Sequence, residues 1–357
     1  MPTQTEAGSV KYMLKWLYRI FLLGILAGSC GLFLYNALAQ TPDQPPDSFT
    51  IETNIQGTLV FSAFRKPHGH TMRLWVIKDQ NLYELGLNGV QPIISRDSKT
   101  LVFQSNGELQ RFSFKLRKGE ILPISKITTL FDYDVSPDGK EICFVTSEIS
   151  QSKGLYGCNL HIGNLNGTNI RCLTQFSPTD TVGGVNNPKW SPAGDSILFT
   201  AFDPTETKGK RNVRLWVIKK DGTGLRKIHN EISNYSVNEP AWSPDGKKVA
   251  FVERPSNPQQ EGYDYEVYVC DADGSNVKRL TNNDWNEREP VFSPDGKQIC
   301  FVSYRHQKVG MAGFGSELYL INADGTNEQR LTPPEKVPGA LGGWAEDHSP
   351  TWGPSSD

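Results

Sequence analysis

The stretch that decides the fold is Glu239-Pro-Ala-Trp-Ser-Pro-Asp-Gly-Lys-Lys-Val-Ala-Phe-Val252, because a close copy follows it as Glu289-Pro-Val-Phe-Ser-Pro-Asp-Gly-Lys-Gln-Ile-Cys-Phe-Val302. Each copy leads into a second shared segment, which begins at Glu266 in the first unit and at Glu317 in the next and contains Ala-Asp-Gly. Both units end in Arg-Leu-Thr. An internal period of about 50 residues indicates a repeat architecture.

Each unit has the chemistry of short β-strands joined by tight turns. Residues 249–252 and 267–270 are β-branched, aromatic or small, and turn residues flank both segments. In Pro-Asp-Gly and Ala-Asp-Gly the glycine supplies a positive φ, and the Asp side chain caps the local backbone. One unit therefore predicts four antiparallel strands, named A to D in chain order. Repeated four-stranded units of this length are typical of β-propeller blades.

The number of blades follows from the weaker copies and from the two ends of the repeat region. Ser136-Pro-Asp-Gly and Ser191-Pro-Ala-Gly mark two more units, and Ser95-Arg-Asp-Ser is a decayed copy. The first unit, from Gly57, has strands B, C and D but no A, whereas Ser349-Pro-Thr-Trp-Gly-Pro is an A strand with nothing after it. We expect this C-terminal strand to complete the first blade. The chain is thus predicted to be an all-β, six-bladed β-propeller of four-stranded antiparallel blades, with no open sheet edge at the join.

Composition agrees with a folded, turn-rich domain. The 33 glycines and 23 prolines indicate many short elements. Charged residues are 21% and aromatic residues 10% of the chain, which argues against disorder. The formal net charge of −2 gives no basic field, so a nucleic-acid partner is not expected.

The N-terminus reads as a separate export segment. Lys11, Lys15 and Arg19 precede an uncharged apolar run over 20–39, which is long enough to cross a bilayer as one hydrophobic helix. The positive-inside rule keeps the basic end in the cytoplasm and sends the rest across. An Ala-Leu-Ala pattern ending at Ala39 fits cleavage as a signal peptide, and the length of the run fits an uncleaved signal anchor. A faint lipoprotein-like box at Cys30 is a third possibility.

The predicted domain organisation is a signal peptide or signal anchor at 1–39, a Pro-rich linker at 40–56 and the propeller at 57–357. All three of these interpretations place the propeller outside the cytoplasm, and a buried helix of a soluble protein is the remaining alternative for the apolar run. The expected location is therefore periplasmic, or anchored in the membrane through residues 1–39 if they are not cleaved.

The repeat Pro-x-Trp-Ser-Pro-Asp-Gly…Ala-Phe-Val…Asp-Ala-Asp-Gly…Arg-Leu-Thr resembles that of the TolB propeller family. The resemblance covers essentially everything after the linker; the last two units match it best and the first two only weakly. TolB itself has an α/β domain before its propeller, where this sequence has the segment 40–56. The resemblance implies an extracytoplasmic propeller and, more loosely, envelope or periplasmic proteins as partners.

Loop lengths suggest which face binds. The A–B and C–D turns are short and alike, whereas the B–C and D–A loops are long and different, and such loops usually carry function. Aromatic residues and arginine serve as anchors in protein interfaces. The candidate partner-binding residues are Tyr235, Tyr263, Trp285, Arg288, Arg305, Phe314 and Trp344. These side chains could equally pack the loops onto the blades.

The same face should open the central channel. The residues just before the A strands would ring its mouth, and they are Gln91, Asp132, Asn187, Glu239, Glu289 and Ser349, with His348 beside them. Acid and amide oxygens suit a hard cation, so a channel cation and a solvated polar rim are both open. No other cofactor and no metal ligand set is predicted.

The expected function is a protein-binding scaffold at the cell envelope that uses the long-loop face, and not an enzyme. No Gly-x-Ser-x-Gly motif occurs in the sequence. Cys158 and Cys172 fall on neighbouring predicted strands, where an exported domain permits a disulfide. The alternative function is a small-ligand or carbohydrate site at the channel mouth. That site could be a metal-dependent lyase or hydrolase, because some propellers of this kind resemble oligogalacturonate lyases.

Overall fold

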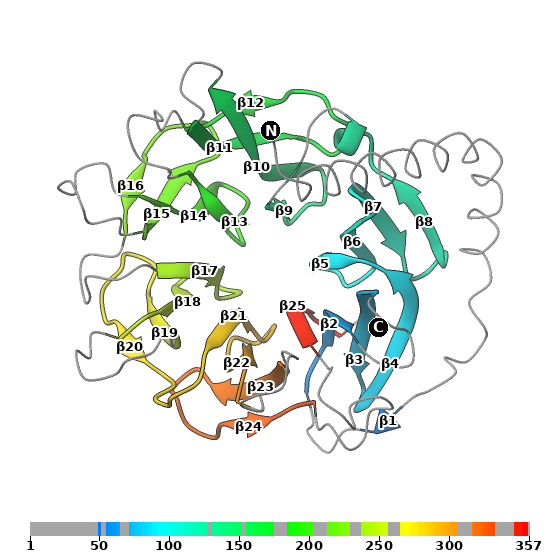
Figure 1. The fold of residues 1–357 in the computed structure, drawn as a ribbon, viewed down its shortest axis with the longest axis vertical. Helices are drawn as coiled ribbons and strands as arrows, with labels where there is room; N and C mark the ends of the chain where they lie inside the picture. The colour runs from blue at the N-terminus through cyan, green and yellow to red at the C-terminus, as the bar shows by residue number, and fades with distance from the viewer. Residues whose placement is uncertain are drawn as a thin grey trace, which may run out of the picture.

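A computed structural model describes the part of the chain that forms the repeats. The described residues are 49–50, 55–64, 71–126, 130, 132–150, 155–174, 184–202, 213–228, 237–255, 265–305, 316–332 and 346–355. They form six antiparallel sheets arranged as blades around a central axis (Figure 1). The prediction of a six-bladed β-propeller is confirmed.

Blade 1 holds the join between the two ends of the repeat region. In order from the axis outward its strands are β25 (Glu346–Gly353), β2 (Thr58–Phe64), β3 (Arg73–Lys78), β4 (Asn81–Asn88) and β1 (Phe49–Thr50). Leu59 pairs with Trp352, and the Trp352 indole Nε1 donates to the carbonyl of Gln56 at 2.8 Å. The C-terminal strand thus closes the ring as predicted. β1 lies inside the segment interpreted as a linker and adds a fifth strand to this blade.

The other five blades have four strands each, and the first strand of each is nearest the axis. Blade 2 comprises β5 (Val90–Ile94), β6 (Thr100–Ser105), β7 (Glu108–Ser113) and β8 (Lys118–Ile121), followed by the short 3-10 helix η2 (Pro123–Lys126). Blade 3 comprises β9 (Tyr133–Val135), β10 (Glu141–Ser150), β11 (Leu155–Asn164) and β12 (Arg171–Cys172). Blade 4 comprises β13 (Asn186–Trp190), β14 (Ser196–Phe202), β15 (Val213–Lys219) and β16 (Arg226–Lys227). Blade 5 comprises β17 (Val237–Trp242), β18 (Lys248–Glu253), β19 (Glu266–Asp271) and β20 (Lys278–Arg279). Blade 6 comprises β21 (Glu287–Phe292), β22 (Gln298–Ser303), β23 (Glu317–Asn322) and β24 (Gln329–Arg330).

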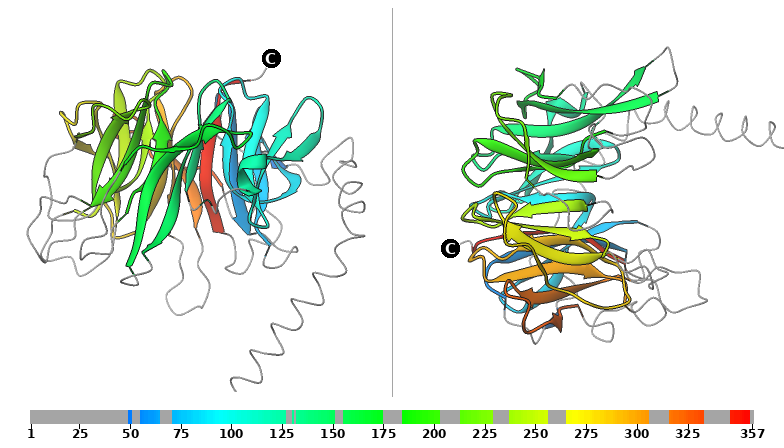
Figure 2. Two further views of the ribbon diagram at one scale, coloured as in Figure 1. Left: turned by 90° about the horizontal axis from the view of Figure 1, so that it is seen from above. Right: turned by 90° about the vertical axis from the view of Figure 1, so that its left-hand side faces the viewer.

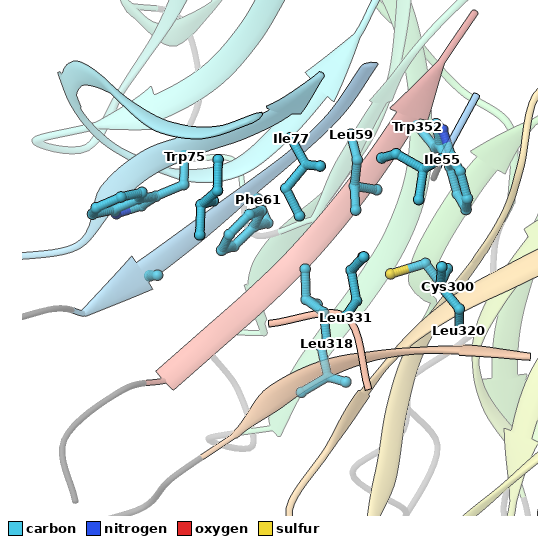
Figure 3. Packing of buried hydrophobic residues seen from close by; sticks show 13 residues of the cluster. Ile55, Leu59, Phe61, Trp75, Ile77, Cys300, Leu318, Leu320, Leu331 and Trp352 are labelled. Carbon is cyan, nitrogen blue, oxygen red and sulfur yellow. The ribbon is translucent and has the colours of Figure 1, made fainter. Parts of the chain in front are cut away.

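The core lies between neighbouring blades. One phenylalanine of each B strand is buried to within 1% of full burial, and the six are Phe61, Phe103, Phe144, Phe199, Phe251 and Phe301. Figure 3 shows one such interface, where Leu59 and Phe61 of blade 1 face Leu318 and Leu331 of blade 6. At each interface the side chains of the two facing sheets interdigitate, and the phenylalanine is among the largest of them.

The Arg-Leu-Thr motif fastens the short outer strands. Thr281 Oγ1 accepts the N–H of Val267 at 2.9 Å, and Thr332 Oγ1 accepts that of Leu318 at 3.0 Å. The motif arginine pairs with the buried Glu that begins strand C, as Arg279 does with Glu266 at 2.7 Å. A D strand of two residues is therefore held by side chains as well as by its own ladder.

The hydrophobic helix predicted at 20–39 lies outside the described residues. Among the residues that are described, no helix has the length and apolar character needed to span a bilayer. Figure 2 shows the strands of the ring running across its thickness, so each blade presents turns at both faces. The A–B and C–D turns share one face, and the other face carries the ends joined by the B–C and D–A connections.

Candidate functional site

The six residues predicted at the channel mouth lie in, or just before, the innermost strand of each blade. We call Gln91, Asp132, Asn187, Glu239, Glu289 and Ser349 the polar ring. All except Asp132 lie within the innermost strands rather than just before them. These five have φ between 49° and 53°, each precedes a proline, and each sits at a register shift in its strand. A positive φ at a residue that is not glycine is uncommon, and it persists only where surrounding contacts fix it.

Those contacts run from blade to blade. Glu239 Oε2 accepts the N–H of Glu289 at 2.8 Å, and Glu289 Oε2 accepts the N–H of Ser349 at 2.5 Å. Asp132 accepts the N–H of Asn187 at 3.1 Å and the Gln91 side-chain amide at 3.3 Å. In three of the blades the bulge turns a backbone N–H, that of Asn187, Glu289 or Ser349, toward the carboxylate of the preceding blade. The polar ring is therefore a set of inter-blade hydrogen bonds.

A cation in the channel would have to compete with the internal partners of these carboxylates. Arg288 Nε donates to Glu239 at 2.8 Å, and the Arg288 guanidinium lies 5.0 Å from the centre of the Tyr265 ring. Burial raises the pKa of Glu239 above its ordinary value, although Arg288 opposes the shift. The described residues include no cluster of three or more His, Cys, Asp or Glu side chains placed to hold a metal ion.

The predicted partner-binding residues fall into three groups. Arg288 and Arg305 make internal ion pairs, and Arg305 binds Glu287 at 2.9 Å and lies over Tyr319 at 4.3 Å. Trp285 is 37% exposed in the loop between β20 and β21. Tyr235, Tyr263, Phe314 and Trp344 lie outside the described residues. His348 is opposite Ser62 in the β25–β2 ladder, and its side chain is not described.

The two cysteines considered for a disulfide lie on neighbouring strands of blade 3. The backbone of Cys172 on β12 is in register with His161 of β11, and Cys158 lies three residues before His161 on the same strand. The side chain of Cys158 is outside the described part of the structure, so the disulfide between Cys158 and Cys172 stays a prediction.

The opposite end of the channel is built from the A–B turns. In blade 3 the Ser136 hydroxyl donates to Asp138 at 2.7 Å and accepts the N–H of Glu141 at 2.9 Å. Blades 2, 5 and 6 repeat both bonds, and blade 4 uses Asp195 in place of the missing turn Asp. The Ser-Pro-Asp-Gly motif thus fixes a rigid turn at the end of each A strand.

The prolines of these turns pack against the next blade. A Cβ on Gly194 would lie 3.6 Å from Pro137, and one on Gly296 would lie 3.7 Å from Pro244. The equivalent prolines of the five blades are Pro137, Pro192, Pro244, Pro294 and Pro354, and we call them the proline ring. Blade 2 departs from it, because Arg96 occupies the proline position and Ser98 the glycine position.

The proline ring encloses a cavity of about 430 Å³ at the centre of the A–B face. All five prolines line it, together with Arg96, Trp242, Val291, Thr351 and Trp352. Its walls come from all six blades and are mostly apolar. The sequence pattern favoured the long-loop face and did not predict this cavity. The available signal was the departure of Ser95-Arg96-Asp97-Ser98 from the repeat.

Comparison with known proteins supports the fold from two directions. The family described as the TolB beta propeller domain matches residues 160–337. The uncharacterized peptidase YuxL of Bacillus subtilis is 27% identical over 126 residues, which are 35% of this chain and 17% of YuxL. The uncharacterized protein Atu1656 of Agrobacterium fabrum is 28% identical over 122 residues, which are 33% of this chain and 38% of that protein. The matches therefore span well under half of these curated relatives.

Solved structures show the same ring of blades. TolB from Acinetobacter baumannii superposes with a TM-score of 0.61 at 19% identity, covering 85% of this chain and 68% of that one. An oligogalacturonate lyase in complex with manganese superposes with a TM-score of 0.50 at 16% identity, covering 80% and 79%. At these identities the likeness shows the fold alone. With its repeat motif, its closure by β25 and the matching family, the chain carries a TolB-like β-propeller.

Proposed function

We propose that this TolB-like propeller is an exported binding protein of the cell envelope, not an enzyme, and that it holds a partner protein at the A–B end of its channel. The observation that carries the proposal is the cavity of about 430 Å³ inside the proline ring. A volume in the range of about 300–1,000 Å³ suits a small ligand or a few side chains. A partner would therefore insert a short segment rather than dock a whole domain.

The walls of the cavity support binding because they are rigid before the partner arrives. Prolines have a fixed φ, and each A–B turn is tied by its own serine and aspartate. Trp242 and Trp352 add large aromatic surfaces. A preorganised site loses little conformational entropy on binding, so apolar contact contributes more fully to affinity.

The long-loop face is the other candidate surface, and its described arginines are used internally. Arg288 is paired with Glu239, and Arg305 with Glu287 and Glu328. Trp285 remains exposed there. Because interface hot spots sit in pockets at the centre of a contact, the cavity is the stronger candidate.

An envelope location is supported by the sequence and by the family. Basic residues precede the apolar run at 20–39, which is the order expected for export. The resemblance to TolB points the same way. Protease accessibility of the propeller in intact spheroplasts tests this part: digestion only after lysis of the inner membrane would contradict it.

The test of the binding site compares two substitutions on opposite faces of the full chain. Val291→Phe puts a ring into the cavity, and Trp285→Ala removes the exposed aromatic of the loop face. We expect Val291→Phe to abolish cross-linking to a defined envelope protein without lowering the melting temperature, and Trp285→Ala to leave it intact. The reverse pattern would move the site to the loop face. Cleavage of an acidic oligosaccharide by the purified chain would replace binding with the lyase alternative.

A further inference from the structure

Arg96 of blade 2 stands at the position that proline occupies in the other five blades. Blades 3 to 6 have proline as the second residue of the A–B turn, and in blade 1, whose strands A and B are not consecutive in the chain, Pro354 directly follows strand A. The backbone turn is the same, because Ser98 N–H donates to Ser95 at 2.8 Å as Gly139 N–H does to Ser136 at 2.8 Å. The change therefore alters the side chain at the cavity mouth and leaves the scaffold unchanged.

Because blade 2 carries arginine in place of proline, one proline–glycine contact between neighbouring blades is missing. A Cβ on Gly194, Gly246 or Gly296 would touch the proline of the preceding blade within 3.6–3.8 Å. A Cβ on Gly139, which follows the arginine-bearing blade, would meet no atom within 4 Å. Gly139 and Pro137 both line the cavity. The space left by the missing proline is thus continuous with the cavity.

Arg96 extends across this opening. Its Nη1 donates to the carbonyl oxygen of Pro192 at 2.8 Å, so the side chain reaches from blade 2 to blade 4. The arginine is exposed, and this is the one hydrogen bond of its guanidinium within the described part of the chain. Arginine carries five N–H donors in a planar fork, so most of its binding capacity faces the cavity mouth and solvent.

The other charged groups near the cavity are already engaged. Arg111 Nε donates to Glu120 at 2.7 Å. Asp134 lies further into the channel, and its Oδ2 accepts the N–H of Trp190 at 2.7 Å. The turn carboxylate of Asp97 accepts from Ser95 Oγ at 2.7 Å. Arg96 is therefore the cation best placed to meet a ligand. It would do so at the rim of the cavity, whereas Asp134 lies deeper.

We propose that Arg96 binds a carboxylate of the peptide segment that enters the cavity, exchanging the Pro192 carbonyl for a two-point ion pair. This inference rests on the proposed function above, and it names the chemistry that the partner must supply. A guanidinium pairs with a carboxylate through two parallel N–H···O bonds, which are stronger than a bond to a neutral carbonyl. The apolar remainder of the segment would lie against the prolines and tryptophans.

The test titrates the full chain with three blocked tripeptides and follows fluorescence, to which Trp242 and Trp352 in the cavity wall contribute. N-acetyl-Ala-Glu-Ala amide carries a side-chain carboxylate, N-acetyl-Ala-Gln-Ala acid carries a terminal one, and N-acetyl-Ala-Gln-Ala amide carries none. We expect at least one acidic probe to bind, more weakly as salt is raised, and the neutral probe not to bind. The arm that binds identifies the source of the carboxylate.

Three substitutions assign the effect to Arg96. Arg96→Gln should weaken binding of the acidic probe about 10- to 100-fold, which corresponds to losing a charged hydrogen bond. Arg96→Lys should restore part of it. Arg226→Gln, an exposed arginine of the outer strand β16, should change nothing.

The outcomes separate this inference from the proposed function. If neither acidic probe binds at millimolar concentration, or if Arg96→Gln binds as well as the unaltered chain, carboxylate recognition is overturned. The proposed function would still stand if Val291→Phe alone abolishes partner cross-linking. If Val291→Phe has no effect on cross-linking, the proposed function itself is wrong, whatever the tripeptides do.

Discussion

The two ends of the channel hold the same six blades together by different chemistry. At the polar ring, a carboxylate of one blade accepts a backbone N–H of the next, as Glu239 does from Glu289. At the proline ring, an apolar ring of one blade packs against a glycine of the next, as Pro244 does against Gly296. The first joint needs five residues in the left-handed region, and the second needs glycine or a positive φ in each turn.

The difference shows where each end can accept a ligand. The three carboxylates of the polar ring, Asp132, Glu239 and Glu289, accept hydrogen bonds from the next blade, so a ligand of these carboxylates would have to compete with bonds that join the blades. The side chains of the proline ring make van der Waals contacts, so replacing one of these side chains leaves a gap and not an unpaired buried polar group. Variation is therefore easier at the A–B end, which is where Arg96 appears.

The largest expected effect comes from breaking the polar ring. Glu239→Ala removes the partner of Arg288 and the acceptor of the Glu289 N–H. Because the ion pair is partly buried, we expect a loss of about 2–4 kcal/mol in the free energy of unfolding, measured by urea denaturation. The matched control is Glu120→Ala, which removes the exposed partner of Arg111 and should cost less than about 1 kcal/mol. Equal losses for the two variants would mean that the ring is not a joint.

A smaller loss is expected at the join between blades 1 and 2 on the A–B face. A Cβ on Gly353 would lie 2.4 Å from Ser98 Oγ and 3.1 Å from Ile94 Cγ2. Gly353→Ala should therefore cost about 1–2 kcal/mol through overpacking. Adding Ser98→Gly removes the closest atom at a position with φ of 54°, which suits glycine. The double variant should recover part of the loss, and a strictly additive pair would contradict this contact.

Much of the fold could be predicted because the repeat specifies it. The turns Pro-Asp-Gly and Ala-Asp-Gly, the alternating strands and the unpaired A strand at Ser349 together determined the blade number and the closure. The positive φ of residues such as Glu239 could not be predicted, because it depends on a carboxylate from another blade. Local sequence preferences disfavour that conformation before proline.

The internal pairing of two candidate partner-binding residues could not be predicted for a related reason. Loop length and aromatic content pointed to Trp285, Arg288 and Arg305, but burial and pairing of the two arginines follow from the tertiary positions of Glu239 and Glu287. The Arg96 turn was interpreted as a decayed repeat. When one repeat departs from the motif but keeps the same backbone turn, the departing residue is itself a candidate functional residue.

The next largest effect is on the pH dependence of the free energy of unfolding. The two ends of the channel should contribute to it in opposite directions. Burial raises the pKa of Glu239 above 4.5, so its contribution to stability is present below that value and is lost as pH rises through the raised pKa. The hydrogen bond from Ser243 lowers the pKa of Asp245 below 3.8, so its contribution is lost as pH falls below that value. Unfolding free energies over a pH series should flatten above 4.5 in Glu239→Gln and below 3.8 in Asp245→Asn. Unchanged slopes in both variants would contradict the assignment.

The smallest effect on stability is expected from completing the proline ring. Arg96→Pro places proline at the second position of a turn whose hydrogen bond matches those of the other blades, and that position favours proline. The variant loses the exposed bond to Pro192 but gains a fixed φ and a contact beside Gly139. These terms oppose each other, so the free energy of unfolding should change by less than about 0.5 kcal/mol. A loss well above that would show that the Arg96 side chain holds blade 2 to blade 4, and its role at the cavity would then be structural. A neutral change would show instead that this position is free to serve a ligand.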